Sequence, residues 1–592
     1  MFLFPALLHF ASVTPTQIPA DLKLLYERSG GMATGRYSEA VDFCRKLEKL
    51  SPMAHVMQFG TSPQGRPMIA LILSRDKEFT ASAVSYSKKP LIFINNGIHS
   101  GEIEGKDASL ILARDILVSK KHTELLDHLN ILIVPVFSVD AHERFNQFHR
   151  INQNGPVEMG WRSTATNLNL NRDFTKADAP EMRAMLKLLQ SYKPDFFFDN
   201  HTTDGGDWQY SIQYQASTGP EVDYTVAAWT AGMIKAMQPK VEKDGFLMAP
   251  YFGGVNAANP KSGISVDTFT PRYSTGYISA MGRACMLVET HMLKPYKHRV
   301  EATYSIVLRT LEYCNKDWYK LRCAGERADA WDSVLRITMS GANSFSYALT
   351  TRLSRESRPF VFRGYKYNPF KSDVSGASTH AWIHENVDTE TTIQDQFVPA
   401  LYVSVPAAFV IPAEWADVIE IMRLHGFQME RMTADRTIEV RSTAFADVRF
   451  PQAPFEGRFQ PSFKETTKSE KRLLPKGSVV IETSQPGLRL LLHLLEPSAP
   501  DSLVKWGLFN SIFEQKEYFE DYSMEPIARK MLETNPALKA EFEEKLKDPA
   551  FAGNSRARLE WFFVRSPYND ERLNRYPVVR LEQTKDVEAV LK

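Results

Sequence analysis

The stretch LIFINNGIHSGE, residues 91–102, decides the fold class of this 592-residue chain. Residues 91–95 form a continuous apolar run ended by an Asn-Gly pair, which is the pattern of a strand buried on both faces of a sheet. Residues 102–120 follow with apolar side chains at helical spacing, so the sequence predicts a helix directly after the strand. The turn between them carries two side chains that can bind a metal, His99 and Glu102.

The same alternation of strand and helix continues through the first half of the chain. Further buried strands are predicted at residues 131–136, 195–200 and 285–289, and helices at residues 181–192 and 297–321. Strands that alternate with helices favour an α/β fold, here a mixed, mostly parallel sheet flanked by helices. In such sheets, ligands bind beyond the carboxyl ends of the strands.

The character of the sequence changes after residue 328. Strand-like segments dominate from there, and predicted helices return toward the C-terminus. A single hydrophobic core stops growing at about 250–300 residues, so a chain of this length requires more than one domain. We therefore predict a catalytic domain over residues 21–328. A second domain, mixed α+β, is predicted over residues 329–592, and the sequence does not indicate its role.

Composition and the N-terminus narrow the possible classes of protein. Lys and Arg total 71 and Asp and Glu total 70, so the formal net charge of +1 argues against a partner that is a nucleic acid. Residues 2–11 are apolar, like the core of a signal peptide. We predict that residues 1–20 are a signal peptide or a tail and that the protein is periplasmic or secreted. It would be cytoplasmic if this run is not a signal. No other segment is apolar for long enough to predict stable membrane insertion.

Side chains with metal-binding and catalytic chemistry gather where the predicted strands end. His99 and Glu102 follow one strand, and His201 and Glu289 stand at the ends of two later ones. Two histidines and a carboxylate suit a catalytic zinc ion, which takes three protein ligands and leaves one position open. An isolated HxxE pair is a common chance occurrence. The combination of these residues at the strand ends of one sheet is what indicates a site.

The order of these motifs resembles that of the carboxypeptidase A-type zinc carboxypeptidases, and the chain is similar to a bacterial member of that family. The resemblance covers roughly residues 22–325. The motifs that carry it are Gly-Thr-Ser-Pro-Gln-Gly-Arg at residues 60–66, the turn with His99 and Glu102, Leu170-Asn171-Arg172-Asp173-Phe174, and the strands that end in His201 and Glu289. The fold that the resemblance implies is the zinc carboxypeptidase-like α/β fold.

The resemblance implies roles for the residues at the strand ends. His99, Glu102 and His201 would bind one Zn²⁺ ion. Glu289 would be the general base that activates the zinc-bound water and passes its proton to the leaving amine. A carboxylate beside zinc can shuttle protons in this way, because zinc makes hydroxide available near neutral pH.

The resemblance also implies how a peptide substrate would be held. Asn171 and Arg172 would bind its free C-terminal carboxylate, because the planar guanidinium of arginine suits a carboxylate. Arg162 would polarise the scissile carbonyl, and Arg150 competes for that role. These assignments require the partner to be a peptide whose C-terminus is unblocked.

The motifs do not determine which tyrosine contacts the substrate. Tyr277 is predicted to close over the substrate, with Tyr273 as the alternative. The family often has Asp two residues before the Asn-Arg pair, where it orients the first zinc-binding histidine. This chain has Asn169 there. An amide oxygen can still accept the imidazole N–H, but it brings no negative charge, so zinc would be slightly more electrophilic.

The leading function is a zinc-dependent peptidase that hydrolyses the C-terminal peptide bond. One alternative is a zinc amidase acting on cell-wall peptides or on side-chain-linked glutamate, which would use the same chemistry. An alternative of another class is a non-catalytic peptide-binding protein that retains the fold. That reading expects a lost ligand or a lost base, whereas all four of these positions are filled here.

Overall fold

The computed structural model describes residues 18–338 and 346–592. The predicted signal segment therefore lies almost entirely outside the described residues, and the periplasmic or secreted location stays a prediction. Among the helices that the structure describes, none is long and apolar enough to cross a membrane. The chain divides into a first unit (Met1–Ala407, Ala416–Glu430, Ile481–Ser502) and a second unit (Ala408–Trp415, Arg431–Val480, Leu503–Lys592).

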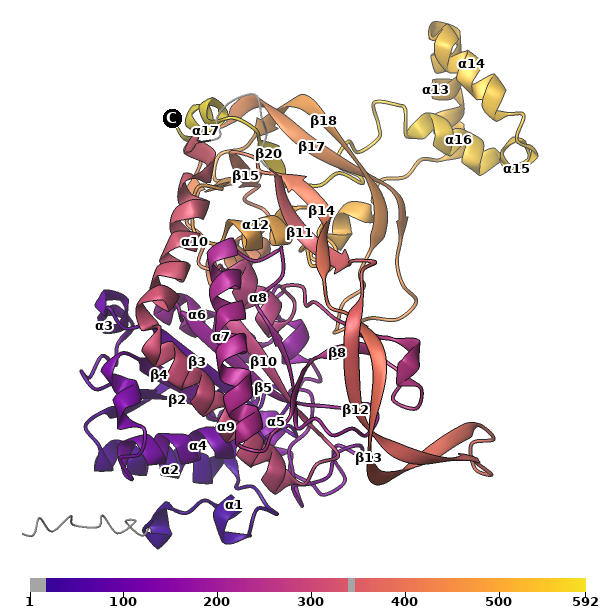
Figure 1. Cartoon of the computed structure of the whole chain (residues 1–592). Coiled ribbons are helices and arrows are strands. Elements are labelled where there is room, and N and C mark those ends of the chain that lie inside the picture. Colours follow the sequence, from indigo (N-terminus) through magenta and orange to yellow (C-terminus); the bar gives the residue numbers. More distant parts are fainter. Residues whose placement is uncertain (1–17, 339–345) are drawn as a thin grey trace, which may run out of the picture. The chain divides into compact units, whose positions relative to one another are not determined.

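An eight-stranded sheet forms the centre of the first unit, with the strand order β1-β2-β4-β3-β5-β10-β6-β7 (Figure 1). Its strands are β1 (Ala54–Thr61), β2 (Pro67–Leu73), β3 (Leu91–Asn96), β4 (Asn130–Val134), β5 (Phe196–Thr203), β6 (Ile212–Ala216), β7 (Met248–Pro250) and β10 (Ala284–His291). The four central strands β4, β3, β5 and β10 are parallel, and β1 and β2 pair antiparallel with their neighbours. Strand β6 pairs antiparallel with β10 and parallel with β7. This mixed sheet confirms the predicted fold class.

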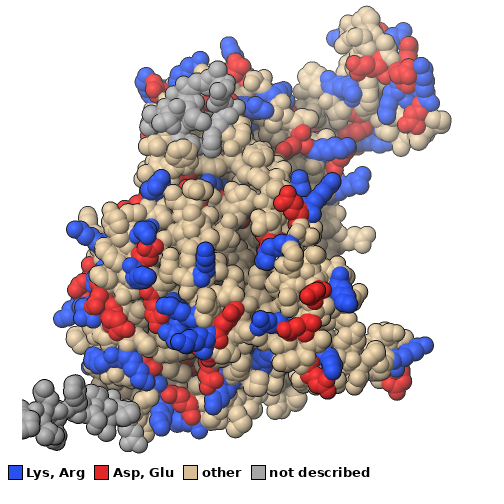
Figure 2. Space-filling view, in the orientation of Figure 1, with Lys and Arg blue, Asp and Glu red and all other residues tan. Residues whose placement is uncertain are grey.

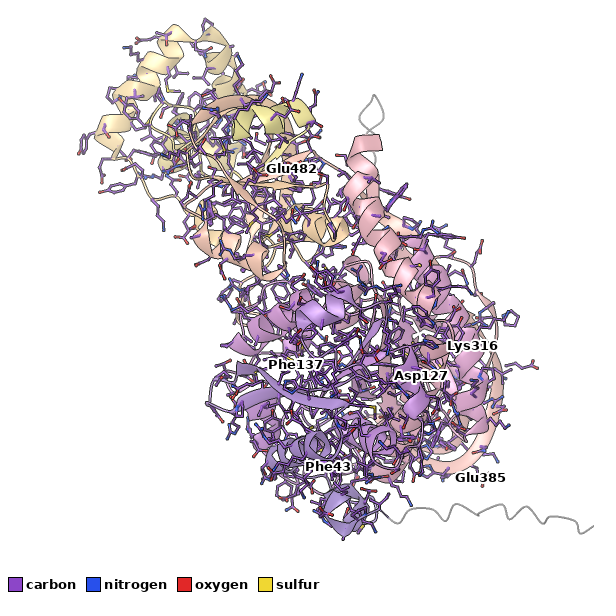
Figure 3. The ribbon with its side chains drawn as sticks, turned by 90° about the vertical axis from the view of Figure 1, so that its left-hand side faces the viewer. Phe43, Asp127, Phe137, Lys316, Glu385 and Glu482 are labelled. Atoms are coloured by element: carbon purple, nitrogen blue, oxygen red, sulfur yellow. The ribbon has the colours of Figure 1, made fainter. Side chains whose placement is uncertain are left out.

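Helices flank this sheet on both faces (Figure 1). One layer contains helices α2 (Tyr37–Leu50), α4 (Glu104–Leu117), α9 (Tyr296–Lys316) and α7 (Tyr224–Lys243), in which α4 contacts α2 and α9 and α9 contacts α7. Helix α8 (Ser274–Ala280) contacts β5 and β10. The interior of the unit is apolar, and Figure 3 labels Phe43 of α2 and Phe137 after β4, both of which are buried.

Side chains of β5 show which helix covers each face of the sheet. Asp199 accepts a hydrogen bond from Ser274 Oγ of α8 at 2.5 Å, whereas the Thr202 hydroxyl donates to Glu104 of α4. Successive side chains of a strand point to opposite faces, so α8 and α4 cover opposite faces of the sheet. His201, two residues after Asp199, points to the α8 side.

A second sheet joins chain segments that are far apart in the sequence. Its order is β12-β13-β9-β8, made of β8 (Phe252–Val255), β9 (Ile264–Val266), β12 (Arg358–Lys371) and β13 (Ser378–Gln394). Trp208, Phe252, Phe362 and Ile393 share one buried cluster beneath it. The first unit extends to Ala407, beyond the predicted boundary at residue 328. The reason is that β13 pairs in parallel with β9 in the same sheet.

The second unit contains a group of helices and strands that pair antiparallel. These strands include β15 (Ala408–Ile411), β20 (Val579–Leu581), β17 (Arg436–Arg449) and β18 (Ser462–Leu474). The helices α13 (Asp521–Thr534), α14 (Pro536–Lys545), α15 (Pro549–Ala552) and α16 (Ser555–Phe563) enclose a cluster of buried aromatic rings that includes Phe542 and Phe562. Acidic and basic side chains are interspersed over the visible surface, in keeping with the near-zero net charge (Figure 2).

Candidate active site

His99, Glu102 and His201 converge at one end of the central strands. Their ligand atoms all lie within 4.8 Å of one another, and all three residues are buried. Glu102 Oε2 lies 3.3 Å from His99 Nδ1 and 2.9 Å from His201 Nδ1. Within residues 18–338 and 346–592, this is the group of His, Cys, Asp and Glu side chains that has the geometry for a metal ion.

The turn between β3 and α4 presents two of these residues. Gly97 begins the turn with φ +65°, and a Cβ there would stand 3.0 Å from Ile103 and 3.4 Å from Val136. Glycine is therefore the residue that this conformation favours. The Glu102 amide then donates to the His99 carbonyl at 2.9 Å, which brings both side chains to the same side of the turn.

Both histidines are held through the nitrogen that does not face Glu102. His99 Nε2 lies 2.9 Å from Asn169 Oδ1, and His201 Nε2 lies 2.9 Å from Asp199 Oδ2. These acceptors favour the tautomer that protonates Nε2 and leaves Nδ1 as a lone pair for a metal. Burial lowers the pKa of His99 to about 4, so its ring is neutral, as a metal ligand must be. The donor set therefore fits a zinc ion.

Glu289 lies beside His201, because β5 and β10 pair in parallel with these two residues directly opposite each other. Its side chain lines the same cleft and is 9% exposed. Burial raises the pKa of Glu289 to about 8. A cation next to His201 would act in the opposite direction and favour the carboxylate form.

Two arginines contact the Glu102 carboxylate. Arg150 lies 2.7 Å and Arg162 lies 3.2 Å from Glu102 Oε1. The Arg150 side chain is 13% exposed and that of Arg162 is 44% exposed. Burial alone would raise the pKa of Glu102, but Arg150 and the two histidines hold it well below its usual range. Both candidates for the carbonyl-polarising arginine therefore lie at the site.

Asn171 and Arg172 line the cleft next to this group, after β4 in the chain. The Asn171 amide oxygen accepts a hydrogen bond from the Ser274 backbone N–H at 3.0 Å. The Arg172 guanidinium lies over the Tyr273 ring, 4.2 Å from its centroid. A guanidinium that stacks on a ring is oriented before a substrate arrives, which suits recognition of a carboxylate.

The structure does not bring Tyr277 into the cleft. This residue is fully buried in α8, where its hydroxyl lies 3.1 Å from His425 Nδ1 and accepts from Gln190 Nε2 at 3.1 Å. Tyr273, the predicted alternative, precedes the first turn of α8 and lines the cleft. Tyr251 also lines it, and the sequence analysis did not identify that residue. Its only signal in the sequence is its position directly after a short strand, β7.

The cleft has a volume of about 370 Å³. Residues that the sequence analysis did not single out also line the cleft, among them Tyr251, Phe269, Leu287 and Met292. The cleft is therefore a pocket with a trio that has the geometry for a metal ion, a carboxylate and three arginines at one edge of an α/β sheet. Such a group can activate a water molecule and bind an anionic end of a substrate.

A family model described as zinc carboxypeptidase matches residues 40–279, which include the ligand trio, Asn171 and Arg172. The first unit contains a zinc carboxypeptidase domain. The protein is thus a hydrolase of peptide bonds, and the family that its matched domain resembles consists of zinc-dependent metallopeptidases that cleave C-terminal residues. The match ends ten residues before Glu289 (289 − 279 = 10).

Named proteins are similar to this chain along much of their length. Carboxypeptidase 2 of Trichophyton rubrum is 20% identical over 478 residues, which are 79% of this chain and 82% of the relative. Carboxypeptidase 2 of Trichophyton equinum is 20% identical over 461 residues, 76% and 79% of the two chains. Among solved structures, a metallo-carboxypeptidase from Burkholderia cenocepacia is 17% identical, with a TM-score of 0.36, and covers 47% of this chain and 69% of its own.

Proposed function

We propose that the protein removes C-terminal residues from peptides with the help of one zinc ion held by His99, Glu102 and His201. The observation that supports this function best is the convergence of these three ligand atoms within 4.8 Å, in a cleft that Glu289 and Arg172 also line. When it is bound, zinc supplies a Lewis acid that can lower the pKa of a coordinated water to about 7.

Glu289 is the proposed general base. It lies beside His201 across the β5–β10 pair, so it can take a proton from the attacking water. The same carboxyl then returns the proton to the leaving amine, which converts a poor leaving group into a neutral one.

Arg172 and Asn171 are proposed to bind the terminal carboxylate of the peptide. The stacking of Arg172 on Tyr273 supports this role, because it directs the guanidinium fork. Arg162 is the proposed partner of the scissile carbonyl, since its side chain is 44% exposed and can reach a substrate. Arg150 is more buried, and its 2.7 Å contact suits a role in compensating the charge of Glu102.

A tyrosine that closes over the substrate is proposed to be Tyr251 or Tyr273, in place of Tyr277. Both line the cleft, whereas the Tyr277 hydroxyl is engaged in the protein interior. Tyr273 already contacts Arg172, which would bring it close to the substrate terminus. Tyr251 follows β7 at the side of the cleft that Thr203 and Asp204 also line.

The function is tested with a library of peptides that exist in matched forms with a free and an amidated C-terminus. Purified full-length protein is incubated with and without a chelator, and the products are read by mass spectrometry. We expect stepwise loss of C-terminal residues from the free acids, arrest by the chelator and resistance of the amides. Release of amino acids only from cell-wall peptides or from side-chain-linked glutamate would favour the amidase. Binding without any hydrolysis would favour the non-catalytic protein.

Asn169→Asp is expected to tighten zinc binding by about 10-fold, within the range typical of residues that support a metal ligand. Asn169 Oδ1 accepts from both His99 Nε2 and the Asn171 backbone N–H at 2.9 Å, and an aspartate oxygen can do the same. The added negative charge makes His99 a more basic ligand. Competition with a chromogenic chelator measures the affinity, and unchanged affinity together with an unchanged pH profile of kcat/KM would contradict this role.

A further inference from the structure

A buried carboxyl lies on the opposite face of the sheet from the cleft and connects the two strands that carry the reactive groups. Glu104, the first residue of α4, is 1% exposed. Its Oε1 atom accepts a hydrogen bond from the Thr202 hydroxyl and another from the Thr290 hydroxyl, the latter at 2.5 Å. Thr202 directly follows His201, and Thr290 directly follows Glu289. One oxygen atom thus joins the neighbour of a proposed ligand to the neighbour of the proposed base.

The register of the strands explains why this junction controls the cleft. His201 lies opposite Glu289 and Thr202 lies opposite Thr290 along the parallel pair of β5 and β10. Alternate residues point to opposite faces, so the threonine hydroxyls meet Glu104 while the reactive side chains face the cleft. The Thr290 hydroxyl also lies 3.3 Å from the His201 carbonyl. Sliding or spreading of the two strands would break these contacts.

A buried arginine compensates the charge of this carboxyl. The second oxygen of Glu104, which has no hydrogen-bond partner among the described residues, lies 3.8 Å from Arg299 Nε. The Arg299 side chain is fully buried, and it donates to the carbonyls of Asn154 at 2.9 Å and of Gly155 and Lys294 at 2.6 Å each. Arg299 therefore ties Glu104 to the loop that follows Arg150 and to the segment that follows β10.

We infer that Glu104 and Thr290 are positioning residues that fix the distance between Glu289 and His201. This inference rests on the proposed function, because it gives the spacing of those two groups a catalytic purpose. Neither residue touches a substrate, since both act from the far face of the sheet. A buried carboxylate that loses a donor is costly, so the network holds one arrangement of the strands in preference to others.

The test compares Thr290→Val, which removes the hydroxyl at nearly constant volume, with Thr290→Ser, which keeps it. Thr230→Val is the matched control, because Thr230 is a fully buried threonine of α7 whose hydroxyl donates to the Val226 carbonyl at 2.8 Å. Rates are given per bound zinc ion, and the melting temperature of each full-length protein is measured to compare stability. The readouts are kcat and KM for a peptide substrate and the visible spectrum of the cobalt-substituted protein, which reports the geometry of the metal site.

We expect Thr290→Val to lower kcat by about 10–100-fold with KM within about two-fold, and to shift the cobalt spectrum, as is typical when support for a metal site is lost. Thr290→Ser should recover most of both, and Thr230→Val should match the unmodified protein. A normal kcat and an unchanged cobalt spectrum in Thr290→Val would overturn the positioning role. So would an equal loss in Thr230→Val. Absence of peptide hydrolysis in the unmodified protein would instead contradict the proposed function, and the cobalt spectra would then still test the network.

Discussion

Glu289→Gln is expected to retain zinc and to lower kcat by about 10²–10⁴-fold, the usual contribution of a general acid–base residue. The amide has the size of the carboxyl but cannot accept a proton from water. Glu289 lies directly opposite His201 across the β5–β10 pair, so the exchange is made beside the proposed metal site. Steady-state kinetics on a C-terminally free peptide, together with zinc analysis of the same preparation, measures both quantities.

The control for this variant is Glu181→Gln. Glu181 is a fully buried carboxyl in the first turn of α6 (Pro180–Tyr192), outside the cleft, and burial raises its pKa. The control also exchanges a buried carboxyl for an amide, so it separates the loss of a base from a general loss of stability. Turnover in Glu289→Gln equal to that of the unmodified protein would remove Glu289 from the reaction and leave only the metal site as the source of catalysis.

His201→Ala is expected to lower the zinc content from about one ion per chain to less than about 0.1, because a catalytic zinc site rests on three protein ligands. Peptide hydrolysis should fall to background. In the unmodified protein a chelator should have the same effect, and added zinc should reverse it. Added zinc should not restore the activity of His201→Ala, because only two protein ligands, His99 and Glu102, would remain for the ion. Metal analysis and the peptide assay measure the two effects.

The matched variant is His55→Ala, which removes a histidine whose side chain is 46% exposed and pairs with Glu48 on the surface. It should keep full zinc content and full activity. Retention of one tightly bound zinc ion in His201→Ala would show that the metal is held elsewhere. The proposed function would then lose its central observation.

The parts of the fold that depend on local pattern could be predicted from the sequence. The apolar run at residues 91–95 lies within β3 (Leu91–Asn96), and the predicted helix at residues 181–192 is α6 (Pro180–Tyr192). Both follow from the spacing of apolar side chains over a few residues. The pairing of β13 with β9 could not be predicted, because it rests on two residue pairs, Ile393 with Ile264 and Gln394 with Ser265, and β9 lies more than a hundred residues earlier in the chain.

The candidate site could also be predicted only in part. The three proposed metal ligands follow or end strands of the sheet, and ligands bind beyond the carboxyl ends of parallel strands. The Tyr277 side chain lies away from the cleft because its hydroxyl contacts His425, a residue far along the chain, and the spacing of tyrosines in the sequence contains no information about that contact. Glu104 also had no signal in the sequence, since a glutamate in the first turn of a helix is ordinary.

The sheet shared by β8, β9, β12 and β13 limits how the enzyme can be shortened for laboratory use. Ending the chain after the long helices would remove two of its four strands and uncover Trp208 and Phe252, which lie only a few residues beyond His201 and Tyr251 in sequence. A trimmed version would carry an open strand edge next to newly exposed rings, a combination that promotes aggregation. A shortened protein that keeps the cleft therefore has to retain the antiparallel pair of β12 and β13.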